Sequence, residues 1–228
     1  MTEKTENVLQ VYEPVSAEVA RCLITAGAYL IDFNRPKSEW YLWKSGITAP
    51  CYCNCRGLPG HPQERQIAVN ALCAAMELFP QKADVALGIE AGGISWGSFV
   101  TQQRFMSSGF VRKKVKEHGT GALIEGKSVA GHKVVLIDDL IGSGETVANA
   151  ATAVENAGGE IIGILSLVNW NFAKMRSRLL NKYPVVCTIS YPQVVRSLQL
   201  LGKITEEQGA ELIKFYENPQ AHEWRTKS

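Results

Sequence analysis

The sequence lacks the features that mark membrane, secreted and strongly charged proteins. No apolar run among the 228 residues approaches the ~20 needed to span a bilayer. Residues 1–14 have no basic region followed by an apolar one, as a secretory signal would. Net charge is only +2, so no global field indicates nucleic acid or a membrane as a partner. We therefore expect a cytoplasmic protein, and its length suits one α/β domain with an appendage.

Cysteine pairs at metal-binding spacing are also missing. Three of the six cysteines alternate in CYCNCR, residues 51–56, where a strand would place successive ones on one face about 6.6 Å apart. The others lie in predicted helices (Cys22, Cys73) and in a predicted strand (Cys187), so no second pair of C-x-x-C type exists. This pattern favours buried free thiols in a reducing compartment over a structural metal.

Helical and strand patterns alternate along the chain, and no internal repeat or low-complexity stretch interrupts them. Apolar spacing predicts helices at 16–33, 62–79, 94–105, 145–158, 172–183 and 205–218. Strands are predicted at 39–43, 51–56, 83–90, 109–114, 134–137, 160–169 and 185–190. Alternation of this kind indicates a parallel sheet flanked by helices, with ligands bound at the carboxyl ends of its strands.

The segment KVVLIDDLIGSGET, residues 133–146, carries the most specific pattern. An apolar run ends in two carboxylates, Asp138 and Asp139, and a loop of small residues follows before a predicted helix. Such loops hold phosphate on free backbone N–H groups at the helix start. A nucleotidase P-loop would carry Gly-Lys-Ser/Thr, and this loop has no lysine. The pattern predicts a phosphate site built from backbone, next to a pair of acids.

Two other strand ends should reach the same edge of the sheet. One carries the glycine turn GIEAGG, and the other a basic segment with Arg112, Lys113, Lys114, Lys116 and His118. The basic segment fits either a solvated surface loop or an anion clamp that closes over a polyphosphate. Paired acids at a strand end suit ribose hydroxyls. Together these groups describe a site for a phosphorylated sugar that bears a further phosphate group.

At this point the sequence resembles a known family. VVLIDDLIGSGET resembles the phosphoribosyl-pyrophosphate signature of type I phosphoribosyltransferases, and the basic segment 110–126 resembles the catalytic loop of the orotate phosphoribosyltransferases. WKSGITAPCYCNCR, residues 43–56, is similar to that family's N-terminal Leu-Lys-Ser-Gly-x-x-Ser-Pro-x-Tyr segment, with Trp for Leu and Ala for Ser. The resemblance implies the type I fold, with an N-terminal helix and hood in residues 1–60 and a transferase core in residues 61–228.

The resemblance also implies roles for individual residues. Those expected to bind phosphoribosyl pyrophosphate are Lys44, Arg112, Lys113, Lys116, His118, Asp138, Asp139, Leu140, Ile141, Gly142, Ser143, Gly144, Glu145 and Thr146. The pyrophosphate turn would be Glu90, Ala91, Gly92 and Gly93. The base would lie along Tyr52, Cys53, Gly142 and Trp170.

The implied reaction joins the ribose to orotate as pyrophosphate leaves, giving orotidine 5′-phosphate for pyrimidine synthesis. Lys116, His118, Arg112 and Asp139 would be the catalytic residues, with charge on the leaving pyrophosphate stabilised by the cations and by Mg²⁺. The ion would be held mainly by substrate and water rather than by a side-chain cage. Family members are homodimers in which this loop reaches the neighbouring site.

Two positions depart from the family and leave the base open. Gly142 stands where a threonine usually touches orotate, and Trp170 stands where an arginine usually pairs with its carboxylate. Trp170 either stacks on a flat ring or belongs to the core. The alternatives are therefore a type I transferase for another base, and a regulator that only binds phosphoribosyl pyrophosphate. A regulator would not need the Arg112–His118 loop.

Overall fold

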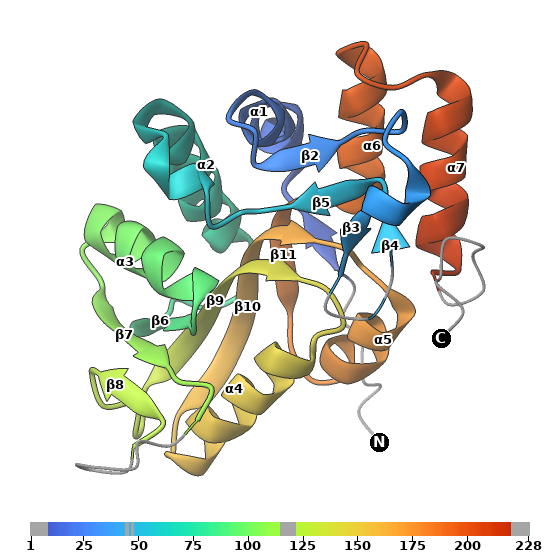
Figure 1. The fold of residues 1–228 in the computed structure, drawn as a ribbon. Helices are drawn as coiled ribbons and strands as arrows, with labels where there is room; N and C mark the ends of the chain where they lie inside the picture. Colours follow the sequence, from blue (N-terminus) through green and yellow to red (C-terminus); the bar gives the residue numbers. More distant parts are fainter. Residues whose placement is uncertain (1–8, 44–45, 47, 115–121, 220–228) are drawn as a thin grey trace.

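A mostly parallel sheet with helices on both faces forms the centre of the molecule (Figure 1). The computed structural model describes residues 9–43, 46, 48–114 and 122–219. The strands are β1 (Gln10–Val11), β2 (Tyr29–Ile31), β3 (Tyr41–Leu42), β4 (Thr48–Ala49), β5 (Cys51–Cys53), β6 (Val85–Ile89), β7 (Ser107–Val111), β8 (Ile124–Gly126), β9 (Lys133–Ile141), β10 (Glu160–Asn169) and β11 (Val185–Ser190). The helices are α1 (Glu13–Thr25), α2 (Pro62–Ala75), α3 (Gly92–Arg104), α4 (Glu145–Asn156), α5 (Ala173–Met175), α6 (Tyr191–Leu200) and α7 (Glu206–Glu217).

The central sheet has the strand order β1-β11-β10-β9-β6-β7-β8. Every neighbouring pair is parallel except β7 and β8, which are antiparallel. The predicted parallel sheet is confirmed. The edge strand β8 is an addition, because the sequence pattern predicts no strand at Ile124–Gly126.

Three element predictions need correction. The helix predicted at 16–33 ends at Thr25, since Gly27 takes a positive φ of 66°, and the chain then continues as β2, paired with β5. The helix predicted at 172–183 is the short α5 followed by a π-helical turn at Arg176–Leu180. Helix α6 was not predicted at all. It begins with a capping box formed by Ser190 and Gln193, a start signal that lies directly behind a strand.

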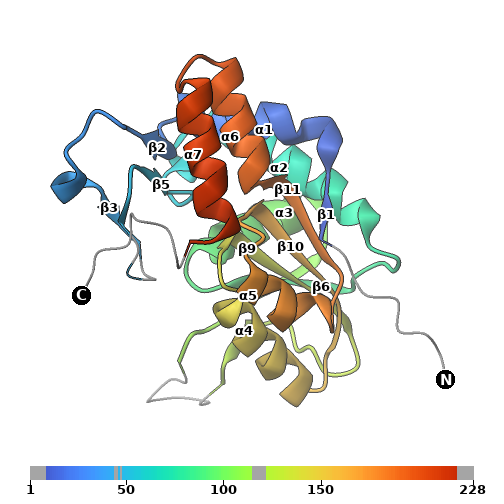
Figure 2. The same ribbon diagram turned by 90° about the vertical axis from the view of Figure 1, so that its right-hand side faces the viewer.

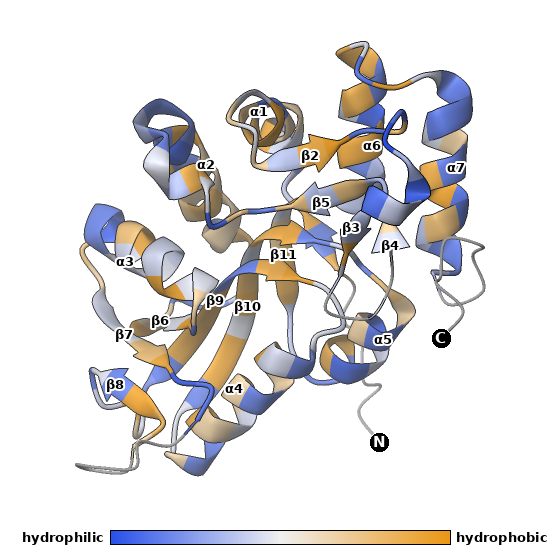
Figure 3. Ribbon diagram, in the orientation of Figure 1, coloured by the Kyte–Doolittle hydropathy of each residue, from blue (hydrophilic) through white to orange (hydrophobic). Residues whose placement is uncertain are grey.

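Alternation along β9 divides the core between the two faces of the sheet. Val135 and Ile137 join one apolar cluster, with residues of α1, α2, α3 and α6. Val134, Leu136 and Ile141 join the other, with residues of α4 and of the turn after α5. Apolar residues therefore run along the central strands (Figure 3), as expected for a parallel sheet that is covered on both faces. No helix in the described part of the chain is long and apolar enough to cross a membrane.

Two small antiparallel sheets, β2–β5 and β3–β4, lie beside the C-terminal helices α6 and α7 (Figure 2). We call residues 29–43 and 48–56 the hood. Ring contacts join the hood to the rest of the chain. The ring centroid of Trp43 lies 5.6 Å from that of Phe215 in α7 and 6.0 Å from that of Trp170. The predicted domain boundary at residue 60 stays a prediction. Strand β1 and helix α1, which precede the hood, contact β11 of the central sheet.

The close approach of α3 to β6 gives a testable prediction. A Cβ atom on Gly88 would collide with the backbone of Gly93 and Ile94, and one on Gly97 would lie 2.9 Å from the Gly88 Cα atom. Gly88→Ala should therefore lower the free energy of unfolding by about 1–3 kcal/mol, the usual cost of overpacking. Gly60→Ala is the matched control, because nothing lies within 4 Å of its Cβ position. Urea denaturation of both variants checks this; equal stabilities would contradict the packing argument.

Candidate active site

Two adjacent carboxylates lie buried at the carboxyl end of β9. Asp138 is 8% exposed and Asp139 is 9% exposed. The Asp139 backbone N–H donates to the Asp138 carboxylate at 2.9 Å. Burial raises the pKa of Asp138 well above its usual range, and the neighbouring Asp139 charge raises it further, while Lys113 lowers it. The pair is therefore held in a fixed orientation, and at least one charge in it is unfavourable in the free protein.

The glycine turn before α3 fits directly against this pair. A Cβ atom on Gly92 would collide with the Asp139 carboxylate, and one on Gly93 would collide with the Ile137 carbonyl. Only glycine at both positions lets the start of α3 come this close to β9. The predicted pyrophosphate turn, Glu90 to Gly93, and the predicted acid pair are thus in contact. The Glu90–Ala91 peptide bond in this turn is cis.

The loop after β9 leads into α4 with free backbone donors. Gly144 is the N-cap residue, with φ 76°, and no side chain caps the helix. The first N–H groups of a helix have no intrahelical partner, and their partial positive charge attracts anions. A Cβ atom on Gly144 would lie 3.1 Å from the Leu179 side chain. Ser143, Glu145 and Thr146, predicted for phosphate, are exposed or partly exposed beside it.

The basic strand end lies on the other side of the acids. The backbone N–H of Lys113 donates to the Glu90 carboxylate at 2.7 Å, and Arg112 pairs with Glu125 of β8 at 3.5 Å. Glu90, Ala91 and the three cations at 112–114 line an open pocket of about 380 Å³. Three predicted residues, Lys44, Lys116 and His118, lie outside the described residues.

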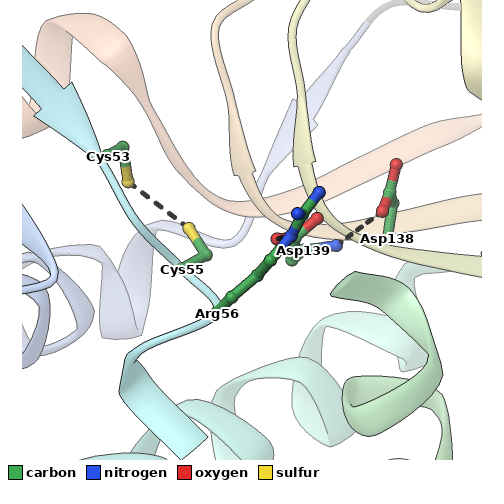
Figure 4. Close-up of polar contacts among 5 residues, drawn as sticks. All are labelled: Cys53, Cys55, Arg56, Asp138 and Asp139. Atoms are coloured by element: carbon green, nitrogen blue, oxygen red, sulfur yellow. Dashed lines mark hydrogen bonds and ion pairs between the residues drawn. The ribbon is translucent and has the colours of Figure 1, made fainter. Parts of the chain in front are cut away.

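The hood reaches the acid pair through Arg56 (Figure 4). Its Nε atom lies 3.7 Å from Asp139 Oδ2, and its side chain is 63% exposed. This contact places the segment CYCNCR close to the acid pair. In the same segment the Cys53 and Cys55 sulfurs are 3.3 Å apart, which contradicts the spacing of about 6.6 Å expected for a continuous strand. The strand ends at Cys53, and a turn then folds Cys55 back.

Of the four residues predicted to contact a base, Trp170 and Gly142 lie against each other, whereas Tyr52 and Cys53 point to opposite faces of β5. Trp170 is 4% exposed, with the ring of Tyr191 at 5.0 Å and that of Trp43 stacked at 6.0 Å. This burial favours the interpretation of Trp170 as a core residue. The edge of its indole faces Gly142, whose Cβ position lies 3.8 Å from Trp170 Cδ1. Tyr52 is 40% exposed and stacks on Tyr41 at 5.9 Å, on the face of β5 opposite to Cys53.

Two further arginines lie at the site: Arg178, which no prediction included, and Arg56, which the sequence offers together with Lys44 as a partner for the orotate carboxylate. The Arg178 guanidinium donates to the Ser143 carbonyl at 2.9 Å, so it lies beside the loop expected to take phosphate. Arg178 reaches this position from the π-helical turn after α5, which no sequence pattern indicated. Arg56 lies in a turn after β5, and only the chain reversal at that point aims it at Asp139.

The donor set suits an oxygen-loving ion that brings ligands of its own. Within the described ranges no three His, Cys, Asp or Glu side chains are grouped so that they could hold a metal ion. The acid pair supplies carboxylate oxygens from two residues only. Mg²⁺ prefers oxygen, keeps several waters and commonly binds through substrate phosphates. The acid pair is therefore compatible with Mg²⁺ that arrives with a polyphosphate.

Comparison with known proteins agrees with these features. The family described as "Phosphoribosyl transferase domain" matches residues 61–199. The orotate phosphoribosyltransferase of Bacillus caldolyticus is 30% identical over 208 residues, which cover 91% of this chain and 98% of the relative. That of Streptococcus agalactiae serotype Ia is 30% identical over 185 residues, covering 81% and 88%. The crystal structure of the enzyme from Aeropyrum pernix is similar in fold, with TM-score 0.69, 22% identity and coverage of 82% and 99%.

Replacing one buried acid should stabilise the protein in a pH-dependent way. The pKa of Asp138 is raised in the folded state, so between the unfolded and folded pKa values the folded state binds more protons. Stability then falls as pH rises through that window. Asp138→Asn removes this loss while keeping an oxygen that can accept the Asp139 N–H. At pH 7.5 it should raise the free energy of unfolding by about 1 kcal/mol or more, one pKa unit being about 1.4 kcal/mol.

The measurement is urea denaturation at pH 7.5 and pH 4, and the gain should shrink at the lower pH. Asp84→Asn is the matched control, since the Asp84 carboxylate also accepts a backbone N–H, from Lys133 at 2.8 Å, but lies away from the acid pair. An Asp138→Asn variant that is less stable than wild type at pH 7.5 would show that the ionised carboxylate supports the fold.

Proposed function

From the premise that this chain belongs to the orotate phosphoribosyltransferase family, we propose that it transfers the phosphoribosyl group of phosphoribosyl pyrophosphate to orotate. The products are orotidine 5′-phosphate and pyrophosphate, as a step of pyrimidine synthesis. The observation that carries the proposal is the buried acid pair, which lies between a glycine turn and an uncapped helix N-terminus. These groups match the hydroxyls, the pyrophosphate and the 5′-phosphate of one substrate.

The sugar phosphate is held by N–H donors and a cation on one side and by carboxylate acceptors on the other. The N–H groups at the start of α4 bind the 5′-phosphate, favoured by the helix dipole, and Arg178 adds a positive charge beside Ser143. Asp138 and Asp139 accept hydrogen bonds from the 2′ and 3′ hydroxyls. Because the Asp139 N–H already fixes the Asp138 carboxylate, little orientation has to be gained when the sugar arrives.

Catalysis depends on charge that builds on the leaving pyrophosphate. As the bond from C1 of the ribose to pyrophosphate breaks, Arg112, Lys113, Lys116 and His118 stabilise the departing negative charge. His118 is also able to donate a proton near neutral pH. Water has to be kept from the site during this step, because it otherwise attacks the cation-like sugar in place of the base nitrogen.

Mg²⁺ is the cofactor we propose, because the acids leave most of an ion's coordination to substrate and water. When bound with the pyrophosphate, it neutralises charge on the leaving group. Asp138 and Asp139 would hold the ribose hydroxyls of the substrate that brings the ion.

We further propose a homodimer in the reducing cytoplasm. The family resemblance assigns Arg112, Lys116 and His118 to a neighbouring subunit's site, which makes each site dependent on two chains. Six free cysteines suit a compartment where thiols stay reduced.

The proposed function is tested by turnover of phosphoribosyl pyrophosphate with Mg²⁺ and with orotate, uracil, adenine or hypoxanthine. Orotate should be preferred in kcat/KM on the order of tenfold or more, since charged and neutral rings differ by at least one ion contact. Chelation of the metal should stop turnover, and added Mg²⁺ should restore it. Preference for an uncharged ring would instead select the alternative, a type I transferase for another base. Binding of phosphoribosyl pyrophosphate without any turnover would indicate a regulator.

Position 170, where the family usually has the arginine that pairs with the orotate carboxylate, holds a buried tryptophan. Arg56 is a cation at the site that can take over this pairing. The base bonds to C1 of the ribose, next to the 2′ hydroxyl that Asp139 would hold, so the Arg56 side chain at 3.7 Å from Asp139 lies close to the ring. Arg56→Gln should raise the KM for orotate roughly tenfold, since hydrogen bonds to charged groups contribute about 1.5–3 kcal/mol. Arg56→Lys should recover part of this loss.

The measurement is steady-state kinetics with orotate and phosphoribosyl pyrophosphate varied in turn. Arg35→Gln is the matched control, because Arg35 is an exposed cation of the hood that lies over the Tyr41 ring. If Arg56→Gln raises the KM for phosphoribosyl pyrophosphate and leaves that for orotate unchanged, Arg56 serves the sugar or pyrophosphate and this assignment is wrong.

A further inference from the structure

The Cys53 and Cys55 thiols form a contact that the proposed reaction does not use. Their sulfur atoms lie 3.3 Å apart (Figure 4), and both are free thiols. No such contact between other cysteine sulfurs occurs in the described part of the chain, which includes all six cysteines. A disulfide has a sulfur–sulfur distance of about 2.05 Å, so these atoms need to approach by roughly a further 1.2 Å to bond.

The backbone holds this pair in place. The Asn54 N–H, between the two cysteines, donates to the Ala28 carbonyl at 2.7 Å, and the Asn54 carbonyl accepts from the Gly57 N–H at 3.0 Å. The first bond extends the pairing of β2 with β5 by one residue beyond Cys53, and the second closes a turn that folds Cys55 back toward Cys53. The sulfur contact therefore follows from main-chain geometry, not from a side-chain rotamer alone.

The two thiols differ in access. Cys55 is 1% exposed, whereas Cys53 is partly exposed. The hydrogen bond with Cys53, burial and the nearby negative charges of the acid pair raise the pKa of Cys55 well above its usual range. Cys51, which precedes Cys53 in β5, is fully buried, and burial raises its pKa to about 11. An oxidant from solution thus reaches Cys53 first, with Cys55 directly behind it.

We propose that Cys53 and Cys55 are a dithiol that hydrogen peroxide oxidises to a disulfide, and that this bond lowers the activity of the adjacent site reversibly. Peroxide oxidises the Cys53 thiol to a sulfenic acid and leaves as one water. The Cys55 sulfur then attacks the sulfenic sulfur, the S–S bond forms, and a second water leaves. In total, two thiols and one peroxide give one disulfide and two waters. A dithiol reductant reverses the change by exchange.

The disulfide acts on the site through Arg56. Arg56 directly follows Cys55 in the chain and contacts Asp139, while the Asn54 backbone is held by Ala28 and Gly57. Drawing Cys55 toward Cys53 therefore moves the backbone that carries Arg56 away from Asp139. A displacement of about 1 Å at an active site can cost up to about a hundredfold in rate. This consequence rests on the proposed function, whereas formation of the bond does not.

The test treats the full chain with hydrogen peroxide, blocks the remaining thiols with an alkylating reagent, and maps the cysteines by mass spectrometry. We expect a Cys53–Cys55 disulfide, with the other four cysteines alkylated after unfolding. Cys55→Ala should prevent the bond and leave Cys53 as a sulfenic or sulfinic acid. Cys51→Ala is the matched control, since it removes a neighbouring cysteine of the same segment, and it should still form the bond.

Activity toward orotate is then compared before and after treatment for each protein. Peroxide should lower the activity on the order of tenfold or more in wild type and in Cys51→Ala, and dithiothreitol should restore it. In Cys55→Ala the activity should fall much less. Wild type that gives Cys53 sulfinic acid without a disulfide would overturn the proposal, as would a disulfide that leaves the activity ratio unchanged. The mass measurement decides the bond even if orotate is not turned over, so failure of the proposed function is recognised separately.

Discussion

Two adjacent carboxylates buried at the end of one strand set the conditions for the rest of the molecule. Asp138 and Asp139 lie near the carboxyl end of β9, where both faces of the sheet are covered. Neutralising them with permanent ion pairs would occupy the oxygens that a sugar needs. The chain instead surrounds them with close backbone, through Gly92, and with one long contact from an exposed arginine. The cost of burying these two carboxylates is therefore not offset by close ion pairs within the described part of the chain.

The buried acid pair destabilises the free protein, and the same acids would bind the sugar. The desolvation that raises the pKa of Asp138 disfavours the charge that ribose hydroxyls would hydrogen-bond. A bound sugar with its metal ion would supply partners and positive charge that the free protein lacks. The start of α4 has no side-chain cap, so its first N–H groups are available to an anion. Both halves of the sugar site are therefore incomplete without ligand, and ligand binding should stabilise the fold.

The base half of the site depends on the hood. Trp43, Trp170 and Phe215 come from the hood, the end of the sheet and the last helix, and their ring contacts join these parts. An arginine at position 170 would place a guanidinium among these rings, where its charge has no described partner. The aromatic packing thus explains why a buried ring suits position 170. A base would then be recognised by residues of the hood, where Arg56 and the Cys53–Cys55 pair lie.

The sequence alone predicted the parallel sheet and the meeting of the acid pair with the glycine turn at its edge. Strand periodicity, the acid pair and the small-residue loop are local patterns, and parallel strands necessarily bring their carboxyl ends to one edge. Residues whose positions depend on non-local packing were not determined in this way. Arg178 reaches Ser143 from a π-helical turn, Cys55 meets Cys53 because Asn54 bonds to Ala28, and Trp170 is buried by rings from distant segments. Only the tertiary structure decided these contacts, because spacing along a chain does not encode which side chains a turn or a neighbouring element brings together.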